Sequence, residues 1–205
     1  MAQLVEDGRS EPDPDAVPDA VFLDWLGHAI DAGVAEPHVA VLATVDGSGA
    51  PDARVLLLRD VTADGWWFSG PSFSPKGRQL AANPAAALTF YWSSVGRQVR
   101  IAGRVSEGSA AAVARDFHER SRTAKAVATA SRQSEVLSNE GDYAARVDEA
   151  ATELDDHPDQ VPEHWRAWCL EADTVEFWQA EPGRRHQRWR YRRTSDGWLR
   201  ETLWP

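Results

Sequence analysis

The feature that most constrains the fold is a series of short apolar runs between residues 38 and 105, each bounded by a turn sequence. Gly, Asp, Asn and Pro gather at residues 46–49, 62–65 and 83–84, where they favour turns. The runs between them are rich in Val, Leu, Thr, Trp and Phe, which is typical of strands. We expect strands at residues 38–45, 53–58, 66–69, 87–93 and 98–105. Strands joined by short turns, without regular alternation with helices, predict an antiparallel sheet.

Helices are predicted on both sides of this region. Five apolar residues fall at helical spacing and share one face, and Gly33 ends that helix: Phe22, Trp25, Leu26, Ala29 and Ile30. Further helices are expected at residues 76–82, 110–119 and 143–154, and further strands at 165–170, 175–178, 188–193 and 198–203. The expected fold class is therefore α+β, mainly antiparallel β, closed into a barrel with flanking helices.

Length and composition limit the class of protein. The 205 residues suit one domain, which we expect at residues 18–205, after a mobile acidic segment at residues 1–17. A net charge of −10 argues against a nucleic-acid partner. The chain lacks an apolar run long enough for a membrane span and a signal-peptide pattern, so a cytoplasmic location is expected. Cys169 is the single cysteine and the histidines are scattered, so neither a disulfide nor a metal site is expected.

Two stretches carry residues suited to an anion. Arg54 opens an apolar strand, where it is either an anion ligand at a barrel rim or a strand-end charge that reaches water. Ser69, Ser74 and Lys76 lie in a loop before a helix, a combination that suits a phosphate but also occurs in ordinary connections.

A third stretch lies near the C-terminus, where residues 184–193 contain six arginines. Arg184, His186 and Arg188 alternate, so in a strand they would share one face, close to Trp178. Such a face suits an anionic aromatic ligand, but it equally suits a solvated edge strand whose charges prevent aggregation.

Taken together, these motifs resemble the pyridoxamine 5′-phosphate oxidase family. The matching segments occur in the family's order from about residue 18 to the C-terminus: ATVDGSGAPDARVLLLRD (43–60), SPKGRQLAANPAAALTFYW (74–92), RQVRIAGRV (97–105), SRQS (131–134), EFWQ (176–179) and RRHQRWRY (184–191). The resemblance implies an FMN-binding split β-barrel of Greek-key type, working as a homodimer with FMN across the interface. It assigns residues of about 164–205 to strands for dimerisation and the active site.

The resemblance also implies a set of FMN-binding residues. It consists of Arg54, Val55, Leu56, Leu57, Phe68, Ser69, Ser74, Lys76, Gln98, Gln133, Ser134, Trp178 and Arg188. Gln98 and Arg188 are expected at the isoalloxazine ring, and Gln133 and Ser134 are expected from the partner subunit. Pro75 stands where the family has an arginine, and Arg78 is a candidate substitute for that phosphate ligand.

On the substrate side, the resemblance assigns Arg184 and His186 to the reacting carbon as catalytic residues. The positions for the substrate phosphate are Arg59, Asp116, Arg120 and Ala124. Two of these depart from the family, because Asp116 replaces a tyrosine and Ala124 a serine, and Asp116 would repel a phosphate.

The implied reaction is oxidation of pyridoxamine or pyridoxine 5′-phosphate to pyridoxal 5′-phosphate, with O₂ reduced to H₂O₂. Because of the two departures, oxidation of a different small molecule, as in phenazine-pathway oxidases, remains the alternative. A protein that holds flavin or pyridoxal phosphate without turnover is a third possibility.

Overall fold

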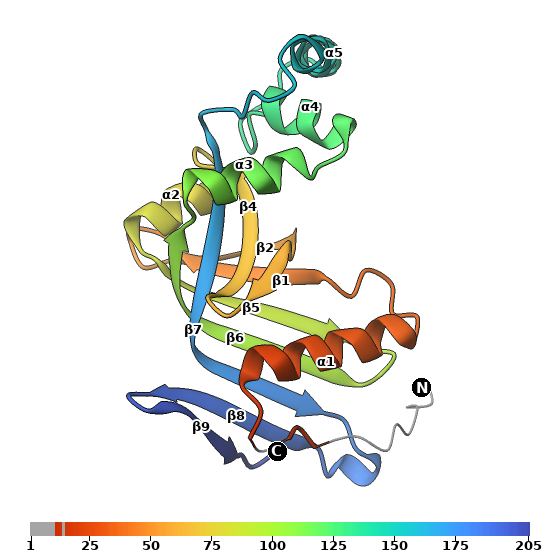
Figure 1. Ribbon diagram of the computed structural model, residues 1–205, viewed down its shortest axis with the longest axis vertical. Coiled ribbons are helices and arrows are strands. Elements are labelled where there is room, and N and C mark those ends of the chain that lie inside the picture. Colours follow the sequence, from red (N-terminus) through yellow and green to blue (C-terminus); the bar gives the residue numbers. More distant parts are fainter. Residues whose placement is uncertain (1–10, 14) are drawn as a thin grey trace.

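The computed structural model describes residues 11–13 and 15–205 of the chain. Its described part contains a curled sheet of nine antiparallel strands, with the order β2-β1-β5-β6-β7-β4-β3 and with β8 and β9 added beside β7 (Figure 1). The strands are β1 (Val39–Val45), β2 (Pro51–Leu57), β3 (Asp60–Thr62), β4 (Gly65–Pro71), β5 (Ala85–Trp92), β6 (Arg97–Glu107), β7 (Trp165–Gln179), β8 (Gln187–Thr194) and β9 (Gly197–Thr202). The predicted antiparallel α+β class is confirmed.

Strand β7 organises the sheet. It pairs with β6 along its length, with β4 near its start and with β8 near its end. The sequence predicted two strands here, because Glu171, Asp173 and Thr174 interrupt the apolar pattern. The structure makes one strand, with a register shift opposite Ala102 and Gly103 that absorbs the irregularity. In Figure 1, β7 runs from the helical end of the molecule down to β8 and β9.

Helix α1 (Pro18–Asp31) covers part of the core. Val21, Phe22 and Trp25 are buried on its inner face, and the Trp25 ring lies 5.1 Å from that of Phe177 on β7. Ile30 is 57% exposed, so its predicted place on this face is wrong, because eight residues at 100° each overshoot two full turns. Gly33 has a φ of 70° and donates to the Ile30 carbonyl, which ends the helix as predicted.

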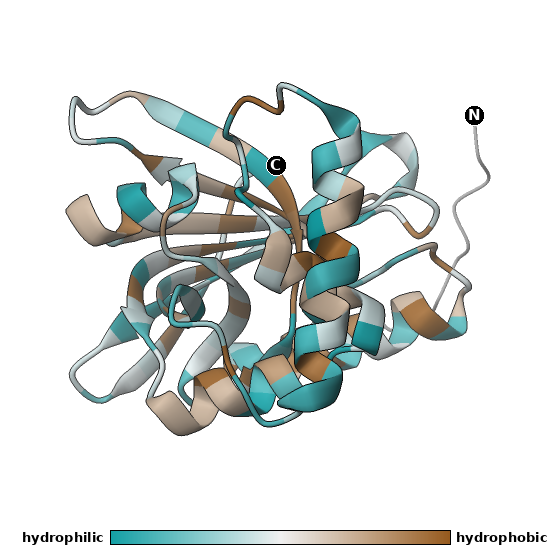
Figure 2. Cartoon of the chain, turned by 90° about the horizontal axis from the view of Figure 1, so that it is seen from above, coloured by the Kyte–Doolittle hydropathy of each residue, from teal (hydrophilic) through white to brown (hydrophobic). Residues whose placement is uncertain are grey.

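Four further helices lie toward the other end of the molecule: α2 (Pro75–Ala82), α3 (Ala110–His118), α4 (Arg122–Ala130) and α5 (Glu140–Asp156). The last three enclose a small second core that includes Phe117, Leu154 and Trp165. Helix α4 was not predicted from the sequence, because it is short and its apolar side chains are mostly alanines. In Figure 2 teal and brown segments alternate along the helices, and brown segments also occur on the strands.

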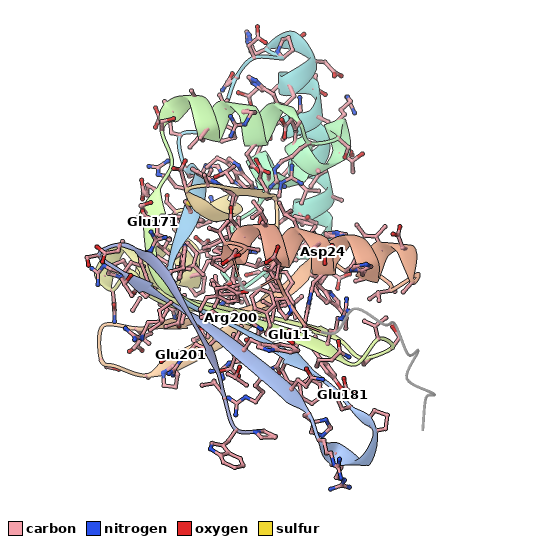
Figure 3. The ribbon with its side chains drawn as sticks, turned by 60° about the horizontal axis from the view of Figure 1, so that its bottom comes forward. Glu11, Asp24, Glu171, Glu181, Arg200 and Glu201 are labelled. Carbon is pink, nitrogen blue, oxygen red and sulfur yellow. The ribbon has the colours of Figure 1, made fainter. Side chains whose placement is uncertain are left out.

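The expectation that residues 1–17 are mobile falls largely outside the described residues. In the described part, Glu11 pairs with Arg200 of β9 at 2.7 Å, and the Tyr191 hydroxyl donates to the Asp13 carbonyl. Figure 3 shows Glu11 beside Arg200. Among the described helices, none combines the length and apolar character that a membrane crossing requires.

Candidate cofactor and substrate site

A cleft of about 440 Å³ opens at the edge of the sheet, between β2, β4, the start of α2 and the loop after α4. It brings together eight of the residues predicted to bind the cofactor. Its lining consists of Asp52, Ala53, Arg54, Val55, Leu56, Ser69, Ser74, Pro75, Lys76, Gln133 and Ser134.

Lys76 is the main buried cation of this cleft, with 7% of its surface exposed. Its Nζ donates to Ser74 Oγ at 3.2 Å and to Gln133 Oε1 at 2.7 Å. Burial, and secondly the charge of Arg54, lower the pKa of Lys76 to about 8. A Cβ atom at residue 70 would lie 2.7 Å from this Nζ, so Gly70 leaves the space that the ammonium occupies. An anion in the cleft would favour the charged form of Lys76 and so oppose both causes of the low pKa.

The local sequence sets the position of Lys76. The Ser74 hydroxyl caps α2 by accepting the Gly77 N–H, and Pro75 occupies the first turn, where its missing N–H has no cost. Lys76 therefore lies in the first turn of a helix, where backbone N–H groups and the helix dipole also favour an anion.

Arg54 is held rigidly at the edge of the same cleft. Its guanidinium donates to Thr44 Oγ1 at 2.5 Å, to Gln79 Oε1 at 2.8 Å and to Asp52 Oδ2 at 2.6 Å. These three supporting residues were missed by the sequence analysis. The sequence contained one signal for Thr44, namely a polar residue at an inward-facing position of β1. In the structure this residue is 1% exposed.

The structure differs from expectation at Arg78 and Gln133, and it leaves Phe68 and Leu57 outside the lining of the cleft. Arg78 does not replace the missing arginine, because it donates to the Phe73 carbonyl and lines a separate hollow beside Asp46. Gln133 was expected from the partner subunit, but it contacts Lys76 of its own chain. Phe68 is 1% exposed in the core, and Leu57 does not line the cleft.

The predicted ring-binding residues lie elsewhere on the sheet. Gln98, Trp178 and Arg188 are paired neighbours on β6, β7 and β8, and they share one face of the sheet. This is the outer face, because residues 97 and 99 beside Gln98 are buried. Arg188 donates to Glu176 Oε1 at 2.8 Å. Arg54 instead projects toward the inner face, since its register partner is the buried Leu42.

The expected strand at residues 188–193 is confirmed, but it does not extend back to Arg184 and His186, so the shared strand face does not form there. Residues 182–184 form a 3₁₀ turn after β7, and β8 begins only at Gln187. Arg184 has a φ of 62°, a strained backbone for a residue with a Cβ. His186 nevertheless stays close to Trp178, with ring centres 4.9 Å apart, and its Nδ1 accepts the Glu181 N–H at 3.2 Å.

Three of the four residues predicted at the substrate phosphate form a partly buried ion cluster next to the cleft. Asp116 of α3 is 8% exposed and accepts hydrogen bonds from Arg59, Arg120, Ser69 and Trp165. Burial alone raises the pKa of Asp116, but the Trp165 and Arg59 hydrogen bonds and the Arg120 charge outweigh it, so the pKa is lowered and the carboxylate is charged. Ala124 lies in the first turn of α4 and offers only a methyl group.

These features define an α+β protein of the split-barrel class, with a cationic cleft at the edge of the sheet suited to a phosphate-bearing ligand. Residues 26–179 match the family model described as pyridoxamine 5′-phosphate oxidase, and residues 165–205 match the pyridoxine 5′-phosphate oxidase C-terminal dimerisation region. The chain belongs to the pyridoxamine 5′-phosphate oxidase family. The second match indicates a homodimer.

Curated relatives are similar in sequence to this chain over nearly its whole length. The pyridoxine/pyridoxamine 5′-phosphate oxidase of Neisseria gonorrhoeae is 40% identical, covering 96% of this chain and 93% of the relative. The enzyme of the same description from a Nocardioides species is 42% identical, covering 97% and 92%.

Solved structures agree on the fold. PhzG from Burkholderia lata, in complex with tetrahydrophenazine-1-carboxylic acid, is 29% identical with a TM-score of 0.88, covering 94% of this chain and 95% of that one. A pyridoxamine 5′-phosphate oxidase-related FMN-binding protein from Nostoc punctiforme has a TM-score of 0.74 at 19% identity, covering 93% and 100%, and supports the fold alone.

Proposed function

We propose that this chain is an FMN-dependent oxidase that converts pyridoxamine or pyridoxine 5′-phosphate to pyridoxal 5′-phosphate. The curated relatives, at about 40% identity over nearly the whole chain, support the reaction. The observation that carries the cofactor assignment is the pair Lys76 and Arg54, two cationic side chains facing one cleft, with the pKa of Lys76 lowered to about 8. When bound, FMN supplies the redox chemistry by taking a hydride from the substrate and passing the electrons to O₂, which yields H₂O₂.

The residues of the cleft fit the phosphate end of FMN. Arg54 offers a guanidinium already oriented by Thr44, Gln79 and Asp52, so little conformational freedom is lost on binding. Lys76 adds a second charge, and Ser69 also lines the cleft. Residues 55–56 line it next to Arg54, and we propose that the rest of the nucleotide passes along them.

The ring-binding residues are best supplied by a second copy of the chain. Ser69, which lines the cleft, pairs with Ala167 near the start of β7, whereas Trp178 lies eleven residues farther along this strand, or about 36 Å. Arg54 and Gln98 also face opposite sides of the sheet. Exposed apolar side chains also lie on the outer face beside Gln98, namely Val41, Val55 and Tyr91. A two-fold dimer would bury this face and bring Gln98, Trp178 and Arg188 of one copy to the cleft of the other.

His186 and Arg184 are the proposed substrate contacts at the reacting end. Because His186 Nδ1 accepts the Glu181 N–H, the neutral imidazole carries its proton on Nε2. In this tautomer His186 donates a hydrogen bond to the substrate rather than taking a proton from it. Arg184 supplies a positive charge from the same loop and orients an electron-rich substrate atom.

Peroxide release tests the proposal directly. Purified protein loaded with FMN should release H₂O₂ when pyridoxamine 5′-phosphate is added under air, with one pyridoxal 5′-phosphate formed per peroxide. The measurement is a coupled peroxidase assay, with product followed by its absorbance. A flavin-loaded protein that forms neither product from either phosphorylated vitamer would contradict the proposed reaction.

Replacing Arg184 by alanine should lower kcat/KM for the best substrate by about tenfold to a hundredfold, the range for a hydrogen bond to a charged group. Arg185→Ala is the matched control, since Arg185 is the adjacent arginine of the same loop and has no predicted contact with substrate. Steady-state kinetics on both variants give the comparison. Unchanged kinetics in Arg184→Ala would show that this loop does not contact the substrate.

The pH dependence of FMN binding follows from the lowered pKa of Lys76. FMN needs the ammonium form, which the free protein loses above about pH 8, so affinity should fall as pH rises, by up to about tenfold per unit. The stability of the FMN-free protein should change in the opposite direction. Because the pKa of Lys76 in the folded state lies below the usual 10.5, this stability rises as pH increases from about 8 toward 10.5. Fluorescence titration between about pH 7 and 9.5 measures the first effect, and Lys76→Met should abolish it.

A second function is favoured by one observation. Arg59 and Arg120 are both engaged by Asp116, which leaves less positive charge for a substrate phosphate. Oxidation of an unphosphorylated ring compound is therefore the alternative, and the structural likeness to PhzG is compatible with it. This alternative would be established if FMN-loaded protein oxidises neither phosphorylated vitamer but releases peroxide with a reduced carbocyclic or heterocyclic acid.

A further inference from the structure

We propose that Asp116 is a specificity-determining residue that acts as a built-in competitor of a phosphate on the substrate. The proposal rests on the oxidase function proposed above and concerns its substrate class. Asp116 makes the pocket beside Ser69 favour a neutral or singly charged group, so a phosphorylated substrate binds with a penalty.

The first step is the position of the cluster. Ser69 lines the cofactor cleft, and its hydroxyl donates to Asp116 Oδ1 at 3.0 Å while accepting from Arg120 at 2.6 Å. The Asp116 cluster is therefore continuous with the cleft. Its members come from different elements, since Arg59 follows β2, Ser69 is on β4, Asp116 is on α3 and Arg120 follows it.

The second step is charge and hydrogen-bonding capacity. Two arginines and one carboxylate leave one net positive charge, whereas the same arginines alone would present two. Arg59 uses its Nε on Asp116 Oδ1 at 2.8 Å, and Arg120 uses its Nε on Oδ2 at 3.2 Å. A phosphate ester carries about −1.5 to −2 charges at neutral pH, which is more than the one net positive charge of this cluster, so the phosphate would remain under-compensated beside Asp116.

The third step is that the arginine and the carboxylate are held together. The Arg120 guanidinium lies 4.5 Å over the Trp165 ring, and the Trp165 indole N–H donates to Asp116 Oδ2 at 2.9 Å. A phosphate that approaches Ser69 from the cofactor cleft therefore meets the Asp116 charge beside the arginines.

The test compares two substrates that differ only in the phosphate, pyridoxamine 5′-phosphate and pyridoxamine, on FMN-loaded protein. Asp116→Asn keeps the shape and the hydrogen-bond acceptor but removes the charge. It should raise kcat/KM for the phosphorylated substrate relative to the unphosphorylated one by about tenfold, mainly through KM. Asp116→Glu, which keeps the charge, should restore most of the wild-type preference.

The matched control is Asp155→Asn. Asp155 also pairs with an arginine of the helical region, Arg122, but both side chains are exposed and outside the cleft. The control should leave the substrate ratio unchanged. If Asp116→Asn fails to fold, Asp116→Tyr combined with Ala124→Ser takes its place and should raise the ratio in the same direction.

The outcomes separate this inference from the proposed reaction. An unchanged or lowered ratio in the charge-removed variant would overturn the role of Asp116 while leaving the oxidase intact. If wild-type protein oxidises neither substrate, the proposed reaction fails, and binding of pyridoxal 5′-phosphate against pyridoxal by calorimetry decides instead. Tighter binding of the phosphate form to Asp116→Asn supports the inference, and equal or weaker binding overturns it.

Discussion

Lys76→Ala is expected to weaken FMN binding by about 1.5–3 kcal/mol, or roughly tenfold to more than a hundredfold in Kd. The Nζ atom is buried beside Ser74 and Gln133 and faces the same cleft as Arg54. Its loss removes a charge from a site of low water access, where a charged hydrogen bond is strongest. Quenching of FMN fluorescence, titrated at neutral pH, measures the change.

Two control variants sharpen this prediction. Lys125→Ala makes the same substitution at the chain's other lysine, on α4, and should leave the Kd unchanged. Arg78→Ala should also leave it nearly unchanged, because that side chain lines a different hollow. Equal losses in Lys76→Ala and Lys125→Ala would mean that overall charge, and not the cleft, governs binding.

A mixed dimer is expected to recover FMN binding that two single variants have each lost. If the cleft of one copy and the outer face of the other form each site, a heterodimer of Lys76→Ala and Arg188→Ala subunits contains one intact site and one doubly altered site. With two different affinity tags, the purified heterodimer should bind about half as much tightly held FMN as wild-type protein. Each homodimeric variant should bind FMN only weakly.

The same experiment distinguishes the alternative in which one chain forms the whole site. In that case every site in the heterodimer would lack either Lys76 or Arg188, and its binding would be the average of the two variants. The exposed outer face of the sheet offers a further check, because Tyr91→Glu would place a charge in the proposed interface without altering the cleft lining, and it should give a monomer in sedimentation that no longer retains FMN.

The sequence by itself determined the sheet, most of its strands and the first helix. Turn residues at fixed places and alternating apolar runs are local signals, and they can be read without knowing the neighbours. Gly33 ends α1 as expected because its positive φ is an intrinsic property of glycine. The residues around the cleft, including Arg54, Ser69, Ser74 and Lys76, were likewise found from short motifs and the family resemblance.

Only the tertiary structure decided which groups these side chains contact. Arg78 is two residues from Lys76, yet the two point into different hollows, because helical neighbours two apart face different sides. Residues 184–186 form a turn rather than a strand, since the Pro182–Arg184 segment bends the chain before β8 can pair. Asp116 lies far from Arg59 in the sequence, and only folding brings the carboxylate between Arg59 and Arg120, where its long-range contacts set the charge that a substrate meets.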